Sequence, residues 1–594
     1  MNGKNNLTIK RYMPGIDGLR AISVLAVIAY HFDFKWAQGG LLGVGIFFVL
    51  SGYLITDQIL LEWKMHKNIF LWNFWIRRLR RLLPAMISML MFVALWLIVT
   101  DPTRLLSLSG DFISSVFYVN NWYLIFHNVS YFDSFGPPSP IGHLWSLSIE
   151  EQFYLVWPVV LLLAIRFAPR RGRLMVYIAV LASISATAMA VMYEPGTDPS
   201  RVYYGTDTRA FAIFIGAALA VGWPSWKLNR RISPTARTLL DCVGGLGLLI
   251  LLILIYRTNE YDDSLYRFGF LYLSIISAIV ISVLAQPASR LAKLLGCKPL
   301  AWIGKRSYSL YIWHYPVITL MHPTGNERLN ILQIMIQLII TFILSILSYT
   351  WIEEPIRKVG VKAQLRFIRS HHWFKPAIIF TFTLLALFRV ESWITNETKV
   401  RSESVQPVIV QEVTSNNQQE LNTDNTEEIP APVPMVKGEG ITVIGDSLAL
   451  NVASVLEEKL PGIVVDGKVG RQMSQAQSVI EDLRAKDKLG DRIVIALGTN
   501  GAFNQSSLSS LLDSLQGEKK IYLVTTRVPK NWQNTVNEAL KDVTREYPNV
   551  KIIDWYAASE NKNDLFYHDG VHLTPEGAQF YASVLVEHIQ EDQG

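Results

Sequence analysis

The sequence predicts two parts of different fold class, a polytopic α-helical membrane domain followed by an α/β three-layer domain with a parallel sheet. The first prediction rests on repeated apolar runs of about twenty residues, each long enough to cross a bilayer. The second rests on short apolar segments that alternate with amphipathic ones after residue 437, a pattern typical of parallel sheets covered by helices. With 594 residues the chain is also too long for one ordinary domain.

Apolar runs long enough to cross a bilayer, or nearly so, occur about eleven times in residues 1–394. Across the whole chain 50% of the residues are hydrophobic and only 18% are charged, which is an apolar composition for a soluble protein. We expect membrane-spanning helices at 15–33, 40–61, 82–100, 150–167, 173–193, 208–223, 238–256, 267–286, 307–322, 330–352 and 376–394.

The loops between these runs differ in charge from one side of the membrane to the other. Alternate loops, together with the N-terminal segment, hold about 28 Lys and Arg residues, and the remaining loops hold about six. Because basic loops stay in the cytoplasm, this pattern predicts a cytoplasmic N-terminus. An odd number of crossings then predicts a multi-pass protein of the cell membrane whose residues after 394 are extracellular.

The net charge of +6 arises in the membrane part, because residues 1–394 carry about +17 and residues 395–594 about −11. The positive balance is therefore an effect of loop charge, and nucleic-acid binding is excluded. Both cysteines, Cys242 and Cys297, precede residue 394, so no disulfide is predicted within the later part. No metal site is predicted.

Residues 395–436 are acidic and contain several prolines, which predicts a flexible extracellular linker. Residues 437–594 then alternate between strand-like and helix-like segments. We expect strands at 441–445, 463–465, 492–497, 520–526 and 550–554, and helices near 448–459, 473–485, 505–515, 530–546 and 575–590. In parallel sheets of this kind, sites form at the carboxyl ends of the strands.

Ser447 follows the first predicted strand, in the stretch VIGDSLALN. At the start of a helix its oxygen would be exposed, beside a helix end that favours negative charge. In HDGVHLTPEG, Asp569 precedes His572 by three residues, so its carboxylate can orient the imidazole that takes the serine proton. The structural alternative makes Asp446 or Ser447 a plain helix N-cap, and makes Asp569 and Thr574 caps around an incidental His572.

A nucleophilic serine also needs hydrogen-bond donors for the oxyanion that forms during attack. Gly470 follows the second predicted strand and Asn500 follows the third. The backbone N–H groups of Ser447 and Gly470, with the side-chain amide of Asn500, predict a three-donor oxyanion hole.

These blocks resemble the SGNH/GDSL hydrolase family over about 150 residues. The resemblance implies a flavodoxin-like SGNH fold and a Ser-His-Asp acyl-transfer mechanism. Gly501 stands where the family often has Asp. The matching blocks are Gly445-Asp446-Ser447, Gly470, Gly498-Thr499-Asn500 and Asp569 to His572.

Ionisable residues within apolar runs are costly and usually functional. Arg20 and His31 share the first run, DGLRAISVLAVIAYHF, and lie about 16 Å apart on a helix, with His31 nearer the outer face. FWIRRLRRLLP adds a cytoplasmic arginine cluster, including Arg78 and Arg81, which suits phosphates. The structural alternatives are a snorkelling Arg20 with a packed His31, and ordinary positive loop charge.

Further polar groups lie at the ends of other runs. HLWSLSIEEQFYLVWP places Glu150 and Glu151 at the outer mouth of a span. YYGTDTRAF contains Tyr204 and Arg209, with Asp207 as an ion-pair partner of Arg209 in the structural alternative. Two other strings with polar groups in or beside spans are KRSYSLYIWHYP, which holds Tyr311 and His314, and WIEEPIRK.

Together these strings resemble the membrane acyltransferase-3 family over about 350 residues. The resemblance implies acetyl-CoA as cytosolic donor, with Arg78 and Arg81 near the coenzyme and His31 near the reacting acetyl group. Tyr204 or a small molecule is a candidate acetyl carrier. The predicted donor and transfer residues of the membrane part, besides His31, are Arg20, Arg78, Arg81, Glu151, Tyr204 and Arg209.

The fusion of two such families resembles the peptidoglycan O-acetyltransferases of Gram-positive bacteria. That resemblance implies acetyl transfer from acetyl-CoA across the membrane, through an acetyl-Ser447 intermediate, to the O6 hydroxyl of muramic acid, which confers lysozyme resistance. The implied partners are acetyl-CoA, peptidoglycan glycan strands and the lipid bilayer. Three alternatives stay open: another surface polysaccharide as acceptor, an exported esterase, and a transporter or binding protein without catalysis.

Overall fold

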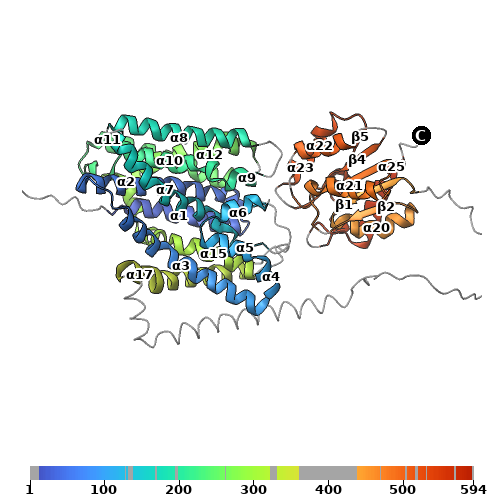
Figure 1. Ribbon diagram of the computed structural model, residues 1–594, viewed down its shortest axis with the longest axis horizontal. Helices are drawn as coiled ribbons and strands as arrows, with labels where there is room; N and C mark the ends of the chain where they lie inside the picture. The colour runs from blue at the N-terminus through green and yellow to red at the C-terminus, as the bar shows by residue number, and fades with distance from the viewer. Residues whose placement is uncertain are drawn as a thin grey trace, which may run out of the picture. The chain divides into compact units, whose positions relative to one another are not determined.

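The computed structural model describes two parts of the chain, a helical part up to residue 359 and an α/β part from residue 438 (Figure 1). Three predictions lie outside the described residues: the span at 376–394, the linker at 395–436, and Asp569. The described residues are 12–127, 129–131, 138–167, 170–193, 199–260, 262–321, 331–359, 438–468, 470–501, 503, 505–515, 519–529, 532–567 and 570–590.

The helical part consists of long helices joined by short ones. The long helices are α1 (Pro14–His31), α2 (Leu42–His66), α3 (Leu71–Thr100), α7 (Trp145–Phe167), α8 (Arg171–Met192), α10 (Thr206–Gly222), α11 (Pro234–Arg257), α12 (Phe270–Ala285), α15 (Ser307–Met321) and α16 (Ile331–Leu347). The short ones are η1 (Lys35–Leu41), α4 (Pro102–Ser107), α5 (Ser109–Val116), α6 (Asn120–Phe126), η2 (Gly142–Leu144), α9 (Ser200–Tyr204), η3 (Ser225–Lys227), η4 (Leu265–Gly269), α13 (Arg290–Leu295), α14 (Lys298–Lys305), η5 (Ser348–Glu353) and α17 (Glu354–Val359).

Each of these long helices overlaps a predicted span. Among the described residues, eight helical segments are long and apolar enough to cross a membrane, and α1 and α15 are not among them. The predicted class of this part, a polytopic α-helical membrane domain, is confirmed.

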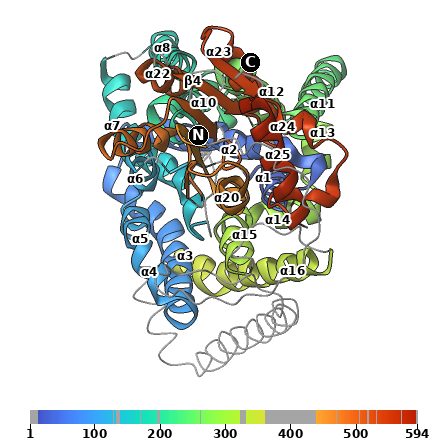
Figure 2. The ribbon, with the colours of Figure 1, turned by 90° about the vertical axis from the view of Figure 1, so that its right-hand side faces the viewer.

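Helix α1 lies inside the helical part, where it packs against α2, α12, α13, α14 and α15 (Figure 1). Its side chains Leu19, Val24 and Val27 are fully buried. Helix α15 packs in turn against α1, α3 and α16 (Figure 2). The two helices that carry His31 and His314 are therefore held within the bundle.

Helices α2 and α10 approach each other closely because glycines lie at their contact. A Cβ atom on Gly52 would lie 1.9 Å from the carbonyl oxygen of Ile213, and one on Gly216 would lie 2.0 Å from that of Val49. In membranes, small residues at helix contacts allow such backbone approach and the dispersion contacts that come with it. This contact fixes α10, and with it Arg209, against α2.

The α/β part is built on a five-stranded parallel sheet with the strand order β2-β1-β3-β4-β5. Val443 of β1 lies opposite Val465 on one side and Val494 on the other. This is the flavodoxin-like order, so the predicted fold class is confirmed. The elements are β1 (Ile441–Gly445), α20 (Ser447–Lys459), β2 (Val464–Gly467), η6 (Met473–Gln475), α21 (Ala476–Ala485), β3 (Arg492–Ala496), α22 (Gln505–Ser514), β4 (Lys520–Val524), α23 (Gln533–Thr544), β5 (Val550–Ile553), α24 (Trp555–Ala558), η7 (Asn563–Leu565) and α25 (Pro575–Gln590).

Helices cover both faces of this sheet (Figures 1 and 2). On one face α21, α22 and α23 bury Ile480, Leu512 and Leu540 against Ile495 and Leu523 of the strands. On the other face α20 and α25 contact each other. Right-handed crossovers require this arrangement. The chain moves one way along the sheet from β1 to β2 and the other way from β2 to β3, so the helices of these two connections lie on opposite faces.

The predicted strands differ from the observed ones mainly at their ends. Strand β2 extends to Gly467, beyond the predicted end at 465, and β4 stops at Val524, before the predicted end at 526. The chain leaves the β4 ladder at Thr526, because its N–H donates to the side chain of Asn537 (2.8 Å). Side-chain bonds of this kind leave no periodic signal in the sequence.

Replacing Gly216 with valine is expected to separate α10 from α2, because the new side chain has no space at the Val49 carbonyl. Detergent-purified protein should lose about 5 °C or more in melting temperature. Gly245→Val is the matched control, since a Cβ on Gly245 meets nothing within 4 Å. Equal melting temperatures of the two variants would contradict the close contact.

Candidate active sites

The α/β part places Ser447 at the junction of β1 and α20. Asp446 caps the helix by accepting a hydrogen bond from the Leu448 N–H (3.0 Å), and Ser447 is the first helical residue. Of the two caps that the structural alternative allowed, Asp446 and Ser447, the structure uses Asp446. A Cβ on Gly445 would lie 2.5 Å from that of Ala449, so glycine lets the helix begin directly at the strand end.

The segments predicted to form the oxyanion hole meet at the same edge of the sheet. Asn500 follows β3 and donates its side-chain amide to Asp446 Oδ2 (3.0 Å), with the Arg471 carbonyl 3.5 Å away. Gly470 follows β2 and turns the chain with a φ of +72°. Strand β1 lies between β2 and β3, so Ser447 stands at the topological switch point, where such sheets bind ligands.

Arg471 is a residue of this site that the sequence reasoning missed. Its side chain is 5% exposed and donates to the Gly445 carbonyl (3.0 Å), to the Asp466 carbonyl, and to the Asp466 carboxylate. It thereby joins the ends of β1 and β2, next to Gly470. In the sequence it is an arginine beside a glycine, which does not differ from a solvated loop residue.

His572 precedes α25 and comes near the serine turn. Its imidazole is close enough to the Asp446 carboxyl to stabilise the carboxylate electrostatically. The chain reaches this position through Gly570, whose φ is +68°, and the His572 carbonyl accepts the Tyr567 N–H (2.8 Å). The orienting role of Asp569 stays a prediction, because that residue lies outside the described part.

A second candidate site lies in the helical part, which encloses a cavity of about 480 Å³. Arg20 of α1 and Arg78 and Arg81 of α3, all predicted donor residues, line this cavity. Glu150 and Glu151 of α7 line it as well. Burial of isolated charges is costly, and the presence of both signs around one cavity offsets part of that cost.

We predicted that Glu150 and Glu151 lie at the outer mouth of their span, away from the cytoplasmic arginines. In the structure they line the same cavity as those arginines. Helix α7 begins at Trp145 rather than at 150, so Glu150 and Glu151 lie within its body and line the arginine cavity. Residues of mixed polarity form the first turn of α7, so the apolar run did not reveal the true start. The Arg78 guanidinium lies over the ring of Tyr154, 5.1 Å from its centroid, which ties α3 to α7.

Next to the cavity lie three histidines, which we call the histidine cluster: His31, His143 and His314. His31 Nδ1 lies 3.1 Å from His314 Nε2, and the ring centroids of His143 and His314 are 5.6 Å apart. His31 Nε2 lies 3.2 Å from the Tyr131 hydroxyl. Tyr311 connects cluster and cavity, since it lines the cavity and its ring packs on both His143 and His314.

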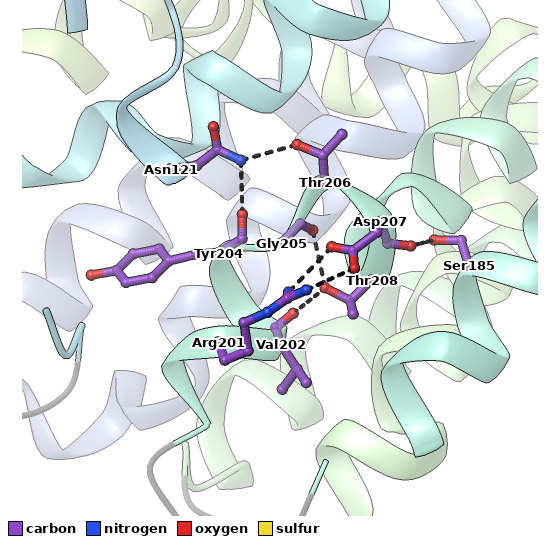
Figure 3. Close-up of polar contacts among 9 residues, drawn as sticks. All are labelled: Asn121, Ser185, Arg201, Val202, Tyr204, Gly205, Thr206, Asp207 and Thr208. Atoms are coloured by element: carbon purple, nitrogen blue, oxygen red, sulfur yellow. Dashed lines mark hydrogen bonds and ion pairs between the residues drawn. The ribbon is translucent and has the colours of Figure 1, made fainter. Parts of the chain in front are cut away.

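The turn between α9 and α10 is held by polar contacts (Figure 3). Arg201 forms an ion pair with Asp207 (2.9 Å), and the Asn121 amide donates to the Tyr204 carbonyl (3.1 Å). Asp207 is thus paired with Arg201, and the alternative in which it pairs with Arg209 is wrong.

Arg209 and Tyr204 are buried but do not line the cavity. The Arg209 guanidinium lies 3.8 Å from the ring centroid of Phe270 and 5.0 Å from that of Tyr203. Within the described residues its three nitrogens have no hydrogen-bond partner. The Tyr204 ring packs on Tyr131, 5.9 Å between centroids, which brings it next to the histidine cluster.

Comparison with known proteins matches both parts of this architecture. A family profile described as an acyltransferase domain matches residues 13–350, which contain the cavity and the histidine cluster. The chain is 41% identical to the peptidoglycan O-acetyltransferase OatA of Listeria monocytogenes, over 97% of this chain and 98% of that one. It is 36% identical to the O-acetyltransferase OatA of Staphylococcus aureus, over 98% and 96% of the two chains.

The chain belongs to the peptidoglycan O-acetyltransferase family. This O-acetyltransferase joins a multi-pass membrane acyltransferase part to an SGNH-type α/β part. Among solved structures, the C-terminal catalytic domain of Streptococcus pneumoniae peptidoglycan O-acetyltransferase A with a methylsulfonyl adduct aligns at 24% identity. That alignment covers 27% of this chain and 96% of that domain, with a TM-score of 0.25.

Burial raises the pKa of the Asp446 carboxyl from 3.8 to about 6, although the Leu448 N–H, the Thr499 side chain and His572 act in the opposite direction. Ionisation of Asp446 therefore opposes folding, and the free energy of unfolding falls as the pH rises through about 6. Relative to an Asp446→Asn variant, the wild-type O-acetyltransferase should lose about 3 kcal/mol of stability between about pH 4 and pH 8.

Chemical denaturation of the α/β part at a series of pH values measures this difference. Asp564→Asn, at an exposed carboxyl, is the control. Stabilities of wild type and Asp446→Asn that run parallel with pH would contradict the assignment.

Proposed function

We propose that the protein moves acetyl groups from cytosolic acetyl-CoA to the O6 hydroxyl of muramic acid in peptidoglycan, with Ser447 as the last carrier on the enzyme. The observation that carries the proposal is the presence in one chain of an arginine-lined cavity and of a serine at a sheet switch point. Its relatives are named O-acetyltransferases, and the one from Listeria monocytogenes is named for peptidoglycan. The product ester confers resistance to lysozyme.

The sidedness of the protein gives each part its task. The asymmetry of basic loops favours a cytoplasmic N-terminus and an extracellular α/β part. Acetyl-CoA is then on one side of the membrane and Ser447 on the other, so the helical part has to pass acetyl across.

The arginine cavity binds acetyl-CoA in this scheme. Arg78 and Arg81 contact the phosphates of the coenzyme, because a guanidinium donates two parallel hydrogen bonds that match phosphate oxygens. Arg20 and Glu151 line the same cavity and hold the coenzyme and these arginines in place. The acetyl end of the donor points toward Tyr311, where the cavity meets the histidine cluster.

His31 acts as the base in the membrane step. A hydroxyl group attacks the thioester carbonyl and gives its proton to His31. The C–S bond then breaks, and the CoA thiolate takes that proton from His31 as it leaves. Tyr204 or a small molecule carries the acetyl group outward. The packing of Tyr204 on Tyr131, which contacts His31, supports a route at this point, and the buried cation of Arg209 lies beside it.

In the extracellular step Ser447 attacks the acetyl carbonyl while His572, oriented by Asp569, takes the serine proton. The departing carrier regains that proton from His572, which leaves acetyl-Ser447. The muramic acid hydroxyl then gives its proton to His572 and attacks the ester, so that acetyl ends on O6 and the serine is free again.

The oxyanion of each tetrahedral intermediate is held by the N–H groups of Ser447 and Gly470 and by the Asn500 amide. In the structure the Asn500 amide donates to Asp446. In this scheme its side chain rotates toward the oxyanion when the charge develops. Arg471 supports this hole by joining the strand ends beneath it.

Ser447→Ala is expected to abolish peptidoglycan O-acetylation, because no other group in the proposed scheme carries acetyl outside the cell. Mass spectrometry of muropeptides from cells that express the variant measures the loss. Ser454→Ala, an exposed serine of the same helix, is the control and should acetylate normally. Increased wall acetylation in Ser447→Ala cells would favour an exported esterase, and loss of acetyl from a different polysaccharide alone would identify that polymer as the acceptor.

Arg78→Ala and Arg81→Ala should each raise the KM for acetyl-CoA about 10- to 100-fold, since each removes a charge-assisted contact worth about 1.5 to 3 kcal/mol. Release of free CoA by the full-length protein in lipid nanodiscs measures this constant. Arg80→Ala is the matched control, because Arg80 is exposed and is not among the residues that line the cavity. A similar KM in all three variants would exclude the cavity as the coenzyme site.

A further inference from the structure

The hydrogen-bond geometry of His314 determines which of its nitrogens carries the proton. Its Nδ1 lies 2.6 Å from the Tyr311 carbonyl oxygen and 3.2 Å from that of Leu310. A carbonyl oxygen only accepts, so Nδ1 has to be the protonated nitrogen. In neutral His314 the Nε2 atom is therefore a hydrogen-bond acceptor.

The same reasoning extends to His31. Its Nδ1 lies 3.1 Å from His314 Nε2 and 3.0 Å from the Val27 carbonyl oxygen. Both neighbours are acceptors, so His31 also carries its proton on Nδ1. The lone pair of His31 is left on Nε2, 3.2 Å from the Tyr131 hydroxyl, which then donates to it.

We propose that His314 is a positioning residue that selects the tautomer of His31 and thereby makes His31 Nε2 the basic nitrogen of the membrane site. The proposal rests on the proposed function, in which His31 is the base for acetyl transfer. The second nitrogen of a catalytic histidine generally sets which nitrogen reacts through the partner it binds. Here that partner is a neutral imidazole.

Two features restrict His314 to this role. Its side chain is fully buried, whereas that of His31 is partly exposed, so His31 and not His314 can meet a reactant, although neither histidine lines the cavity itself. Its own N–H is held by the backbone of α15, so it has no free proton to give to His31. A proton taken up by His31 therefore enters and leaves through Nε2, and the hydrogen bond to His314 becomes charge-assisted while the imidazolium exists.

The Val27 carbonyl alone would determine the tautomer of His31 less strongly than it does together with His314. It already accepts a backbone hydrogen bond within α1, because His31 is four residues further along the same helix. His314 adds an acceptor from a different helix and so fixes the plane of the His31 ring as well as its tautomer. The pairing lies at the contact between α1 and α15.

Substitutions that differ only in reach test this inference. His314→Gln can present its amide oxygen near the position of Nε2, whereas His314→Asn ends near the position of Nδ1 and cannot reach His31. Relative to wild type, His314→Asn and His314→Leu should lower kcat for acetyl-CoA turnover about 100-fold with little change in KM, because misplacement of a reacting group has costs of that order. The kcat of His314→Gln should be at least about tenfold higher than that of His314→Asn.

The measurement is CoA release from acetyl-CoA by the full-length protein in lipid nanodiscs. His66→Leu, at an exposed histidine, is the control and should keep the wild-type kcat. Folding of each variant is checked by size exclusion and thermal unfolding. Because Gln and Asn are both amides, their comparison decides the question even if His314→Leu fails to fold.

Equal kcat values for the Gln and Asn variants, or a wild-type kcat for His314→Leu, would overturn the proposal. His31→Ala separates this failure from failure of the proposed function. A fully active His31→Ala variant would refute His31 as the base, whereas an inactive His31→Ala with a fully active His314→Leu would refute the positioning role alone.

Discussion

Charge buried inside an apolar helical bundle is the constraint on which the structure of the membrane part depends. Each ion taken from water costs several kcal/mol even after the protein relaxes around it. The chain meets this cost by placing Arg20, Arg78 and Arg81 around one cavity with Glu150 and Glu151. Helix α1 then sets the distance between the two groups, since Arg20 at the cavity and His31 in the histidine cluster lie about 16 Å apart along it.

The α/β part solves a different problem, the placement of one serine hydroxyl at a rigid sheet edge, where Ser447 is 9% exposed rather than open to solvent as we expected. Its means are backbone geometry and one buried arginine that joins two strand ends. Gly445 lets α20 start on the strand end, Asp446 takes the capping position, and Arg471 joins β1 to β2. The side chain of Ser447 is therefore not needed to cap the helix. In the proposed scheme the two parts act on opposite sides of the membrane.

Much of the fold could be predicted from local pattern. The strand predicted at 441–445 has the observed bounds, and the one predicted at 492–497 ends one residue earlier, at Ala496. Both were recognisable because short apolar runs between turn residues are typical of buried strands, and the order of the GDS, GTN and DGVH motifs indicated the SGNH architecture. Of the predicted arginines of the membrane part, Arg20, Arg78 and Arg81 converge on one cavity, whereas Arg209 does not line it. His143, Tyr131 and Arg471 were missed because they lie on turns or short segments, where no periodicity marks a functional side chain. Glu150 and Glu151 were misplaced because the mixed polarity of the first turn of α7 hid the start of that helix.

By itself the sequence determined the class of each part, the order of the elements and the residue types of the candidate sites, since these follow from hydrophobic period and from motif spacing along the chain. Only the tertiary structure decided which polar groups meet. It paired Asp207 with Arg201, set His314 against His31 across two helices, and brought the glutamates to the arginines. Such partners are chosen by the packing of helices distant in sequence, and that packing depends on shape and burial that no single segment encodes.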